Sequence, residues 1–292
     1  MNFYRKLRNL LCRTYAEGEA SAICFMLFEE VCTLKRSDIL MGRDDELEDT
    51  DIHKLECLAE RIADGEPVQY AIGYTDFCGL RINVGPGVLI PRPETEELVG
   101  WIQEELSSET CKNNISDKPF VRILDIGTGS GCIALALASS VTSSKVDAWD
   151  ISDEALEIAR RNASSLDLDV SFTKRDALAP NLNEEEKGLY RIIVSNPPYI
   201  CDSERAEMEI NVLEHEPETA LFVPDTDPLL FYREITIKAT QMLAQGGSLF
   251  FETNRRYAKD VSDIMRNNGF SDVEIRKDFM GNERMVKGTI KN

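Results

Sequence analysis

The stretch that decides the fold is Leu124-Asp125-Ile126-Gly127-Thr128-Gly129-Ser130-Gly131-Cys132, in which an apolar strand runs into a glycine-rich turn. A short apolar helix is predicted directly after it, at residues 133–138. Glycine lets a backbone approach a ligand closely, and the first turn of a helix offers unpaired N–H groups. The pattern therefore predicts a nucleotide or nucleoside site. Its G-x-G-x-G spacing differs from the G-x-G-x-x-G of dinucleotide folds, and a purely structural turn is the alternative.

Strand-like and helical segments alternate from residue 121 onward. Strands are predicted at residues 121–126, 145–149, 170–173, 192–195 and 248–252, with helical spacing between them. This alternation predicts an α/β fold in which helices cover both faces of an open, mostly parallel sheet. Residues 273–277 and 285–290 flank Gly281-Asn282 and predict an antiparallel hairpin that extends the sheet.

The first 73 residues have a different pattern. Apolar residues recur at helical spacing within 23–31 and 52–62, which predicts a small helical bundle. The acidic residues 44–49 between them are most simply a solvated loop. Residues 77–84 and 88–90 read as two short strands around a turn, Gly85-Pro86-Gly87. We therefore expect a helical domain at 1–73, a hairpin linker at 74–92 and an α/β domain at 93–292.

Composition excludes several classes of protein. The 292 residues include 33 Lys and Arg against 52 Asp and Glu, a net charge of -19, which disfavours a duplex nucleic acid as the main partner. Basic residues interrupt the amino-terminal stretch, and the longest apolar run, 132–138, is far shorter than the ~20 residues that span a bilayer. The eight cysteines show no C-x-x-C, and there are two histidines. We expect a cytoplasmic protein without a metal site or a membrane segment.

An acidic residue ends the second predicted strand. Asp150 follows the glycines by about twenty residues, where a carboxylate can accept hydrogen bonds from both ribose hydroxyls. The alternative role, capping the next helix, suits Ser152 better. Asp176 follows the third strand and is predicted to reach the adenine edge, although a solvated loop aspartate explains it almost as well.

The motif Asn196-Pro197-Pro198-Tyr199 ends the fourth predicted strand, the edge at which ligands of open α/β sheets bind. Consecutive prolines remove two N–H donors and turn carbonyl oxygens outward. Asn196 adds a side-chain acceptor and Tyr199 a flat ring. Two acceptors and a ring suit a planar –NH2 group, whose nitrogen would then face an electrophile. A proline-rich turn without such a role would explain the prolines but not the whole combination.

These motifs together resemble the release factor glutamine methyltransferase (PrmC/HemK) family. The resemblance runs from about residue 20 to about 290. Besides the glycine turn, it rests on Pro67-Val68-Gln69-Tyr70, Leu89-Ile90-Pro91-Arg92-Pro93-Glu94-Thr95-Glu96, Asn196-Pro197-Pro198-Tyr199-Ile200 and Glu216-Pro217 with Ala220-Leu221. It implies a helical substrate-recognition domain joined by a β-hairpin to a Rossmann-like, seven-stranded class I methyltransferase domain. It also implies S-adenosylmethionine as methyl donor and, as partner, a bacterial release factor whose Gly-Gly-Gln glutamine is methylated on its side-chain nitrogen.

The resemblance also assigns roles to residues. The cofactor-binding set is Gly127, Thr128, Gly129, Ser130, Gly131, Asp150, Asp176, Ala177 and Asn196. The substrate amide would be held by Asn196, Pro197, Pro198 and Tyr199, with Asn196, Pro197 and Tyr199 as the catalytic residues. Ala177 cannot supply the ring that this position carries in some relatives. Glu252-Thr253-Asn254 stands where relatives often show Glu-x-Gly.

Three alternatives remain open on the sequence. A ribosomal-protein glutamine methyltransferase would use the same chemistry. An adenine-N6 DNA methyltransferase would also grip a planar amino group, but it must flip its base and bind phosphates, which the negative charge opposes. A non-catalytic adenosine-binding protein is the third. The acids at 44–51 and 202–218 predict either an acidic rim that receives a basic protein tip or a merely solvated surface.

Overall fold

The computed structural model describes residues 3–112, 120–179 and 182–291. Their contacts divide the chain into two compact units. The first contains residues 1–74 together with 208–215, and the second contains residues 75–207 and 216–292. The sequence did not assign the segment 208–215 to the helical region, and the proposed boundaries at 73, 74 and 92 stay a prediction.

The first unit is helical, as its apolar spacing predicts. Its helices are α1 (Phe3–Leu11), α2 (Glu17–Cys32), α3 (Arg36–Leu40), the 3-10 helix η1 (Arg43–Asp45), α4 (Asp49–Ala63), α5 (Val68–Ile72) and α9 (Ile210–His215). Helices α1, α2 and α4 pack on one another around Leu27, Phe28 and Leu55, whose side chains are fully buried. The interpretation of residues 44–49 as a solvated loop is wrong at Asp44. Its carboxylate is buried and accepts the Tyr4 N–H of α1 at 2.9 Å, which satisfies an otherwise unpaired helix-end donor.

The second unit is built on a seven-stranded sheet in the described part of the chain, with the order β10-β11-β9-β6-β3-β4-β5. All pairings from β5 to β9 are parallel, and β11 runs antiparallel to both of its neighbours. The strands are β3 (Val121–Ile126), β4 (Ser144–Asp150), β5 (Val170–Lys174), β6 (Tyr190–Ser195), β9 (Leu243–Glu252), β10 (Phe270–Lys277) and β11 (Glu283–Ile290). Each strand predicted from residue 121 onward, including the final hairpin, is thus confirmed.

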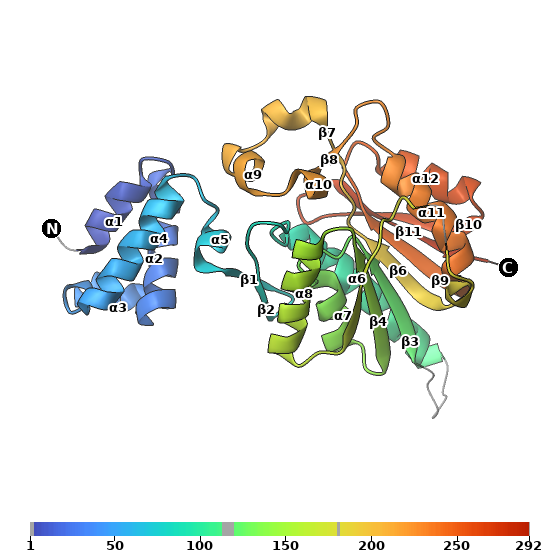
Figure 1. Ribbon diagram of the computed structural model, residues 1–292, viewed down its shortest axis with the longest axis horizontal. Helices are drawn as coiled ribbons and strands as arrows, with labels where there is room; N and C mark the ends of the chain where they lie inside the picture. The colour runs from blue at the N-terminus through green and yellow to red at the C-terminus, as the bar shows by residue number, and fades with distance from the viewer. Residues whose placement is uncertain (1–2, 113–119, 180–181, 292) are drawn as a thin grey trace. The chain divides into compact units, whose positions relative to one another are not determined.

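Helices cover both faces of this sheet (Figure 1). They are α6 (Pro93–Lys112), α7 (Cys132–Ser140), α8 (Asp153–Leu166), α11 (Leu230–Met242) and α12 (Ala258–Asn267). Successive strand residues point to opposite faces. In β9, Phe251 packs with the buried residues of α11 and α12, while its neighbour Phe250 meets Trp101 of α6 edge to face at 5.4 Å between ring centroids. The sheet is therefore buried on both sides, which explains the continuous apolar runs in its sequence.

Shorter elements complete the second unit. They are the 3-10 helices η2 (Glu184–Glu186) and η3 (Asp202–Glu207), the parallel pair β7 (Ile200–Cys201) and β8 (Phe222–Val223), helix α10 (Glu218–Leu221), and the hairpin of β1 (Tyr74–Phe77) and β2 (Leu80–Asn83), whose first residue belongs to the first unit.

A hairpin lies within the predicted linker, but its strands differ from the prediction. The turn falls at Cys78 and Gly79, which both adopt positive φ, rather than at Gly85-Pro86-Gly87. Residues 88–90 form no strand. The apolar run there has another cause, because Val88 and Ile90 are buried in an irregular segment, part of which lines the pocket described below.

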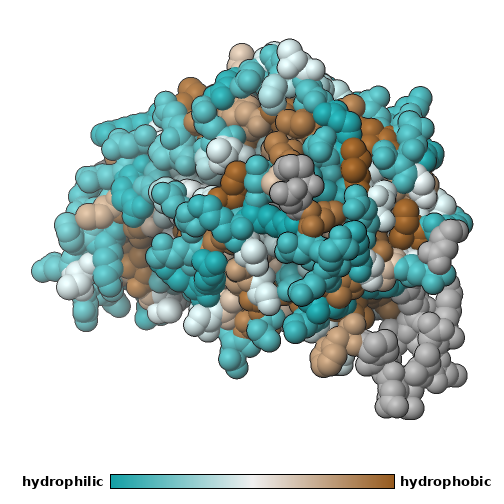
Figure 2. Space-filling model, turned by 45° about the vertical axis from the view of Figure 1, so that its right-hand side comes forward, coloured by the Kyte–Doolittle hydropathy of each residue, from teal (hydrophilic) through white to brown (hydrophobic). Residues whose placement is uncertain are grey.

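Hydrophilic side chains cover most of the face shown in Figure 2, with hydrophobic ones in smaller groups between them. Among the described helices, none combines the length and apolar composition that crossing a bilayer requires. Within the same residues, no group of three or more His, Cys, Asp or Glu side chains is arranged to hold a metal ion.

Candidate active site

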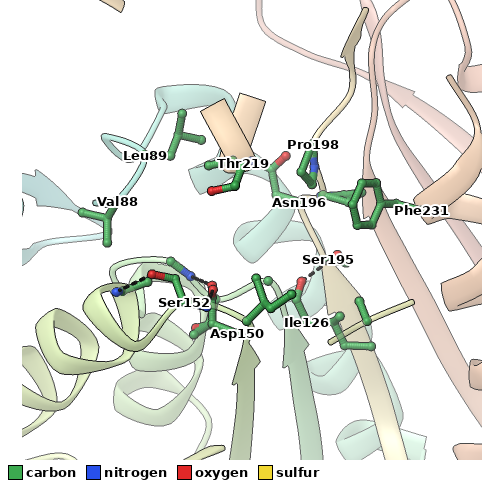
Figure 3. A pocket seen from close by; sticks show the side chains of 18 of the residues that line it. Val88, Leu89, Ile126, Asp150, Ser152, Ser195, Asn196, Pro198, Thr219 and Phe231 are labelled. Carbon is green, nitrogen blue, oxygen red and sulfur yellow. Dashed lines mark hydrogen bonds between the residues drawn. The ribbon is translucent and has the colours of Figure 1, made fainter. Parts of the chain in front are cut away.

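A pocket of about 450 Å³ opens at the carboxyl ends of β3, β4 and β6, and every residue that lines it belongs to the second unit. Because these three parallel strands are neighbours, their ends bring together the glycine turn, Asp150 and Asn196. In Figure 3, Asp150 and Ser152 lie on one side of the pocket, with Asn196 and Pro198 on another and Val88 and Leu89 on a third. We call the first the glycine side and the second the asparagine side.

The glycine side is formed by the turn after β3. The N–H groups of Gly127 and Thr128 both donate to the Trp149 carbonyl, at 2.8 and 2.9 Å, so the turn is fixed to the adjacent strand. Gly127 and Gly129 have φ of +78° and +55°, and a Cβ atom added to either would meet no protein atom within 4 Å. Since both residues line the pocket, this open space is available to a ligand.

Gly131 serves a different purpose from its neighbours. It precedes α7 with φ of +84°, and an added Cβ would lie 3.2 Å from both Ala159 Cβ and Leu135 Cδ1. It does not line the pocket, whereas Thr128 and Ser130 do. Its missing side chain therefore allows α7 and α8 to pack closely. The prediction that Gly131 contacts the cofactor stays untested.

Asp150 lies at the end of β4 and is half-buried. Its Oδ2 accepts the Gly129 N–H at 2.8 Å, and its Oδ1 accepts the Ser152 N–H at 2.9 Å. Ser152 Oγ in turn accepts the Ala155 N–H and caps α8, as the sequence predicts. A carboxylate has about four lone-pair sites, so each oxygen of Asp150 can still accept a hydroxyl from a ligand.

A second carboxylate, Asp125, lies beneath the glycine turn and is completely buried. Thr128 Oγ1 donates to its Oδ2 at 2.6 Å. Burial raises the pKa of Asp125 to about 7, an effect that the Thr128 hydrogen bond opposes and the charge of Asp150 increases. Asp125 has no role among the sequence-based assignments, although it stands two residues before Gly127, the first glycine of the turn.

The pocket continues past β5 to Asp176 and Ala177, both of which line it. Asp176 Oδ1 accepts the Leu178 N–H at 2.7 Å, so part of this carboxylate holds its own loop. The preceding Arg175 stacks on Trp149 at 4.0 Å and forms an ion pair with Glu186. These contacts fix the backbone next to the predicted adenine position.

The asparagine side is formed by the motif after β6. Asn196, Pro197 and Pro198 line the pocket. Tyr199 lies beside it rather than in its wall, packed against the core, and its hydroxyl donates to Glu252 Oε1 at 3.4 Å. Burial raises the pKa of the Tyr199 phenol, and the nearby Glu252 carboxylate adds to this effect. The structure thus brings three of the four motif residues together at the pocket.

A buried chain of hydrogen bonds holds the Asn196 side chain. Asn196 Nδ2 donates to Thr95 Oγ1 at 3.3 Å, and Thr95 Oγ1 donates to Glu252 Oε2 at 2.6 Å. Thr95 and Glu252 are 2% and 1% exposed. Burial raises the pKa of Glu252, while the Thr95 hydrogen bond and the charge of Arg284 act in the opposite direction.

Comparisons with known proteins agree with this architecture. Residues 4–73 match the family described as PrmC N-terminal domain, and residues 106–218 match the family described as Methyltransferase small domain. Over 280 residues the chain is 43% identical to a release factor glutamine methyltransferase of Bacteroides thetaiotaomicron, covering 96% of each protein. The chain belongs to the release factor glutamine methyltransferase family. A Flavobacterium psychrophilum member is 40% identical over 98% of this chain and 97% of its own length.

The fold is shared with solved structures of more distant proteins. The catalytic domain of hMettl16, solved in complex with MAT2A 3'UTR hairpin 6, has a TM-score of 0.53 and 18% identity, covering 84% of this chain and 82% of its own. A human methyltransferase 10 domain containing protein has a TM-score of 0.50 and 19% identity, covering 73% of this chain and 88% of its own. At these identities the likeness establishes only the class I methyltransferase fold.

This member of the family is an S-adenosylmethionine-dependent methyltransferase. Two observations show that the glycine side is suited to binding S-adenosylmethionine. An open cradle lies above Gly127 and Gly129, where a side chain would intrude, and the Asp150 carboxylate at the pocket wall retains acceptor capacity for ribose hydroxyls.

Several pocket residues have no role in the sequence-based assignment. They include the apolar residues Val88, Leu89, Ile151, Leu230 and Phe231, and the polar residues Arg92 and Thr95. Ile151 is 55% exposed, and the signal that could have identified it is a large apolar side chain directly after Asp150 and before the Ser152 cap. Arg92 and Glu216 form an ion pair at 2.7 Å, and both stand in stretches that carried the family resemblance.

Proposed function

We propose that the protein transfers a methyl group from S-adenosylmethionine to the side-chain amide nitrogen, N5, of the glutamine in the Gly-Gly-Gln motif of bacterial release factors. The observation that carries this proposal is the position of Asn196, Pro197 and Pro198 in the wall of the pocket that the glycine turn and Asp150 also line. Family membership supports release factors as the substrate class.

Different residues of the pocket have different roles in this proposal. We propose that Gly127, Gly129 and Asp150 bind the cofactor, with Asp176 and Ala177 beside its adenine. S-adenosylmethionine supplies a methyl group that its sulfonium already activates. Catalysis then requires positioning and charge stabilisation more than a strong base.

The asparagine side suits a primary amide. The side-chain oxygen of Asn196 and an outward carbonyl of the proline pair can accept the two amide hydrogens of glutamine. This orients the nitrogen and stabilises positive charge as its bond to the methyl carbon forms and the bond between that carbon and the sulfonium sulfur breaks, which would leave S-adenosylhomocysteine. One N–H proton then leaves to solvent, which restores a neutral, secondary amide. Tyr199 would assist by packing next to this loop.

The predicted acidic rim is partly neutralised within the protein. Arg205 pairs with Asp202 and Glu218 at 3.1 and 2.7 Å, and Arg256 pairs with Glu204 at 2.5 Å. Glu216 is likewise paired and buried. A basic protein tip would therefore meet less negative charge than the sequence suggests, and the proposal does not depend on this rim.

The decisive experiment incubates the protein with methyl-labelled S-adenosylmethionine and a purified release factor, followed by peptide mass spectrometry. We expect the label on the glutamine of Gly-Gly-Gln and none on a release factor in which alanine replaces that glutamine. Asn196→Ala should lower the rate about 100- to 1,000-fold, because a positioned hydrogen-bonding group that acts in the transition state is lost. Calorimetric affinity for the cofactor should change only a few-fold.

Parallel reactions with purified ribosomal proteins and with duplex DNA test the other substrates. Label on a ribosomal-protein glutamine or on adenine, with none on the release factor, would overturn the proposal. So would undiminished release-factor methylation by Asn196→Ala.

A further inference from the structure

The side-chain amide of asparagine can be turned by 180°, which exchanges its oxygen and nitrogen. Only one orientation of Asn196 is useful for gripping a substrate amide through its oxygen. The surroundings of Asn196 must therefore select that orientation, and the buried network below it has the required asymmetry.

The asymmetry begins at Glu252. Both of its carboxylate oxygens accept hydroxyl protons, Oε1 from Tyr199 at 3.4 Å and Oε2 from Thr95 at 2.6 Å. A threonine hydroxyl has one proton to donate. Because Thr95 gives that proton to Glu252, its oxygen can only accept a hydrogen bond from Asn196.

We propose that Thr95 and Glu252 are positioning residues that hold the Asn196 amide with its nitrogen toward Thr95 and its oxygen toward the pocket. Asn196 Nδ2 lies 3.3 Å from Thr95 Oγ1, in keeping with this direction. The inference rests on the proposed role of Asn196 and adds two residues that act through it.

The charged groups around Glu252 come from several elements. Arg284 of β11 favours its ionised form, Glu94 of α6 opposes it, and the phenols of Tyr199 and Tyr232 lie against it. A neutral amide at position 252 could donate to Thr95 Oγ1, and the Thr95 proton would then be free to turn toward Asn196. Both orientations of the Asn196 amide would become available, and part of the population would be unproductive.

The test uses near-isosteric variants of the full chain. Thr95→Val and Glu252→Gln should each lower kcat for release-factor methylation about 10-fold, a loss of about 1.4 kcal/mol, with the KM for S-adenosylmethionine nearly unchanged. Thr95→Ser keeps the hydroxyl and should recover most of the rate. The double variant should be no slower than the slower single variant, because both act through one chain of hydrogen bonds.

Thr236→Val is the matched control. Thr236 is also fully buried, and its hydroxyl has no partner among the described residues, so the substitution changes the interior equally without touching Asn196. A kcat of Thr95→Val within twofold of the kcat of Thr236→Val would overturn the inference. Additive losses of kcat in the double variant would overturn it as well. If Asn196→Ala retained full activity, the proposed function itself would fail, and this outcome is distinguishable from the first because it does not involve Thr95.

Discussion

The two sides of the pocket are each supported by a buried carboxylate, but the two carboxylates are held in different ways. On the glycine side, Asp125 is bound by Thr128, three residues away in the sequence. On the asparagine side, Glu252 is bound by Thr95 and Tyr199, which are 157 and 53 residues away. Both carboxyl groups have raised pKa values because burial disfavours their charge.

The difference shows how each side is built. The glycine side is assembled from one strand, one turn and the strand beside it, so its geometry follows from neighbouring residues. The asparagine side depends on α6 packing against β9, the strand beside β6. Its motif is local, but the contacts that orient the motif are not. The following predictions test this distinction, beginning with the largest expected effect.

Replacing the local carboxylate should change how stability depends on pH. The ordinary pKa of 3.8 is raised to about 7 in folded Asp125, so between these values the folded state holds a proton that the unfolded state has released. The free energy of unfolding therefore falls as pH rises through this window, by up to about 1.4 kcal/mol per pH unit. Asp125→Asn lacks this loss and should gain about 3 kcal/mol relative to wild type between about pH 4 and pH 7.

Urea unfolding of both proteins at several pH values measures this difference. Glu216 and Glu252 also contribute to the pH dependence of stability, but their contributions are the same in both proteins and cancel in the difference. Asp169→Asn, which replaces an exposed carboxylate, is the control and should keep the wild-type profile. A difference between Asp125→Asn and wild type that does not vary with pH would contradict the local account of the glycine side.

Breaking a distant contact on the third side of the pocket, beside Val88 and Leu89, should cost about 2 kcal/mol. Arg92 pairs with Glu216, 124 residues away, and the Glu216 side chain is 1% exposed. Arg92→Met leaves a buried carboxylate whose remaining donor, within the described part of the chain, is the Ile90 N–H at 3.3 Å. Loss of a buried partner costs about 3–5 kcal/mol, which we reduce because Arg92 itself is partly exposed. Chemical denaturation measures the loss.

The Arg92→Met loss should shrink at low pH, since Glu216 can then bind a proton. Adding Glu216→Gln removes the unpaired charge and should restore part of the stability. If Arg92→Met unfolded at the wild-type denaturant concentration, the long-range ion pair would not be supporting this side.

The smallest effect separates two glycines within the glycine side. Gly131→Ala places a methyl group 3.2 Å from Ala159 and Leu135 and should destabilise the protein by about 1–2 kcal/mol. Gly129→Ala meets no protein atom, so it should cost less stability but weaken cofactor binding. Thermal unfolding and calorimetric titration compare the pair. Equal effects of the two variants on binding would show that Gly131 also contacts the cofactor.

Much of the fold was predictable because its signals are local. Strands of the large sheet were found from apolar runs, and the Ser152 cap from the residues that follow it. Where prediction failed, a local pattern had a distant cause. Val88 and Ile90 are apolar because they are buried beside other segments, and Asp44 is acidic because it binds the first turn of α1.

The sequence by itself determined the alternating α/β architecture, the glycine turn with Asp150, and the position of Asn-Pro-Pro-Tyr at a strand end. These features depend on periodicity and turn chemistry within about twenty residues. Only the tertiary structure decided which side chains support them: Thr95 and Glu252 under Asn196, Glu216 against Arg92, and the inclusion of residues 208–215 in the helical unit. The physical reason is that contacts between residues 100 or more positions apart depend on the order of strands in the sheet, which no local pattern specifies.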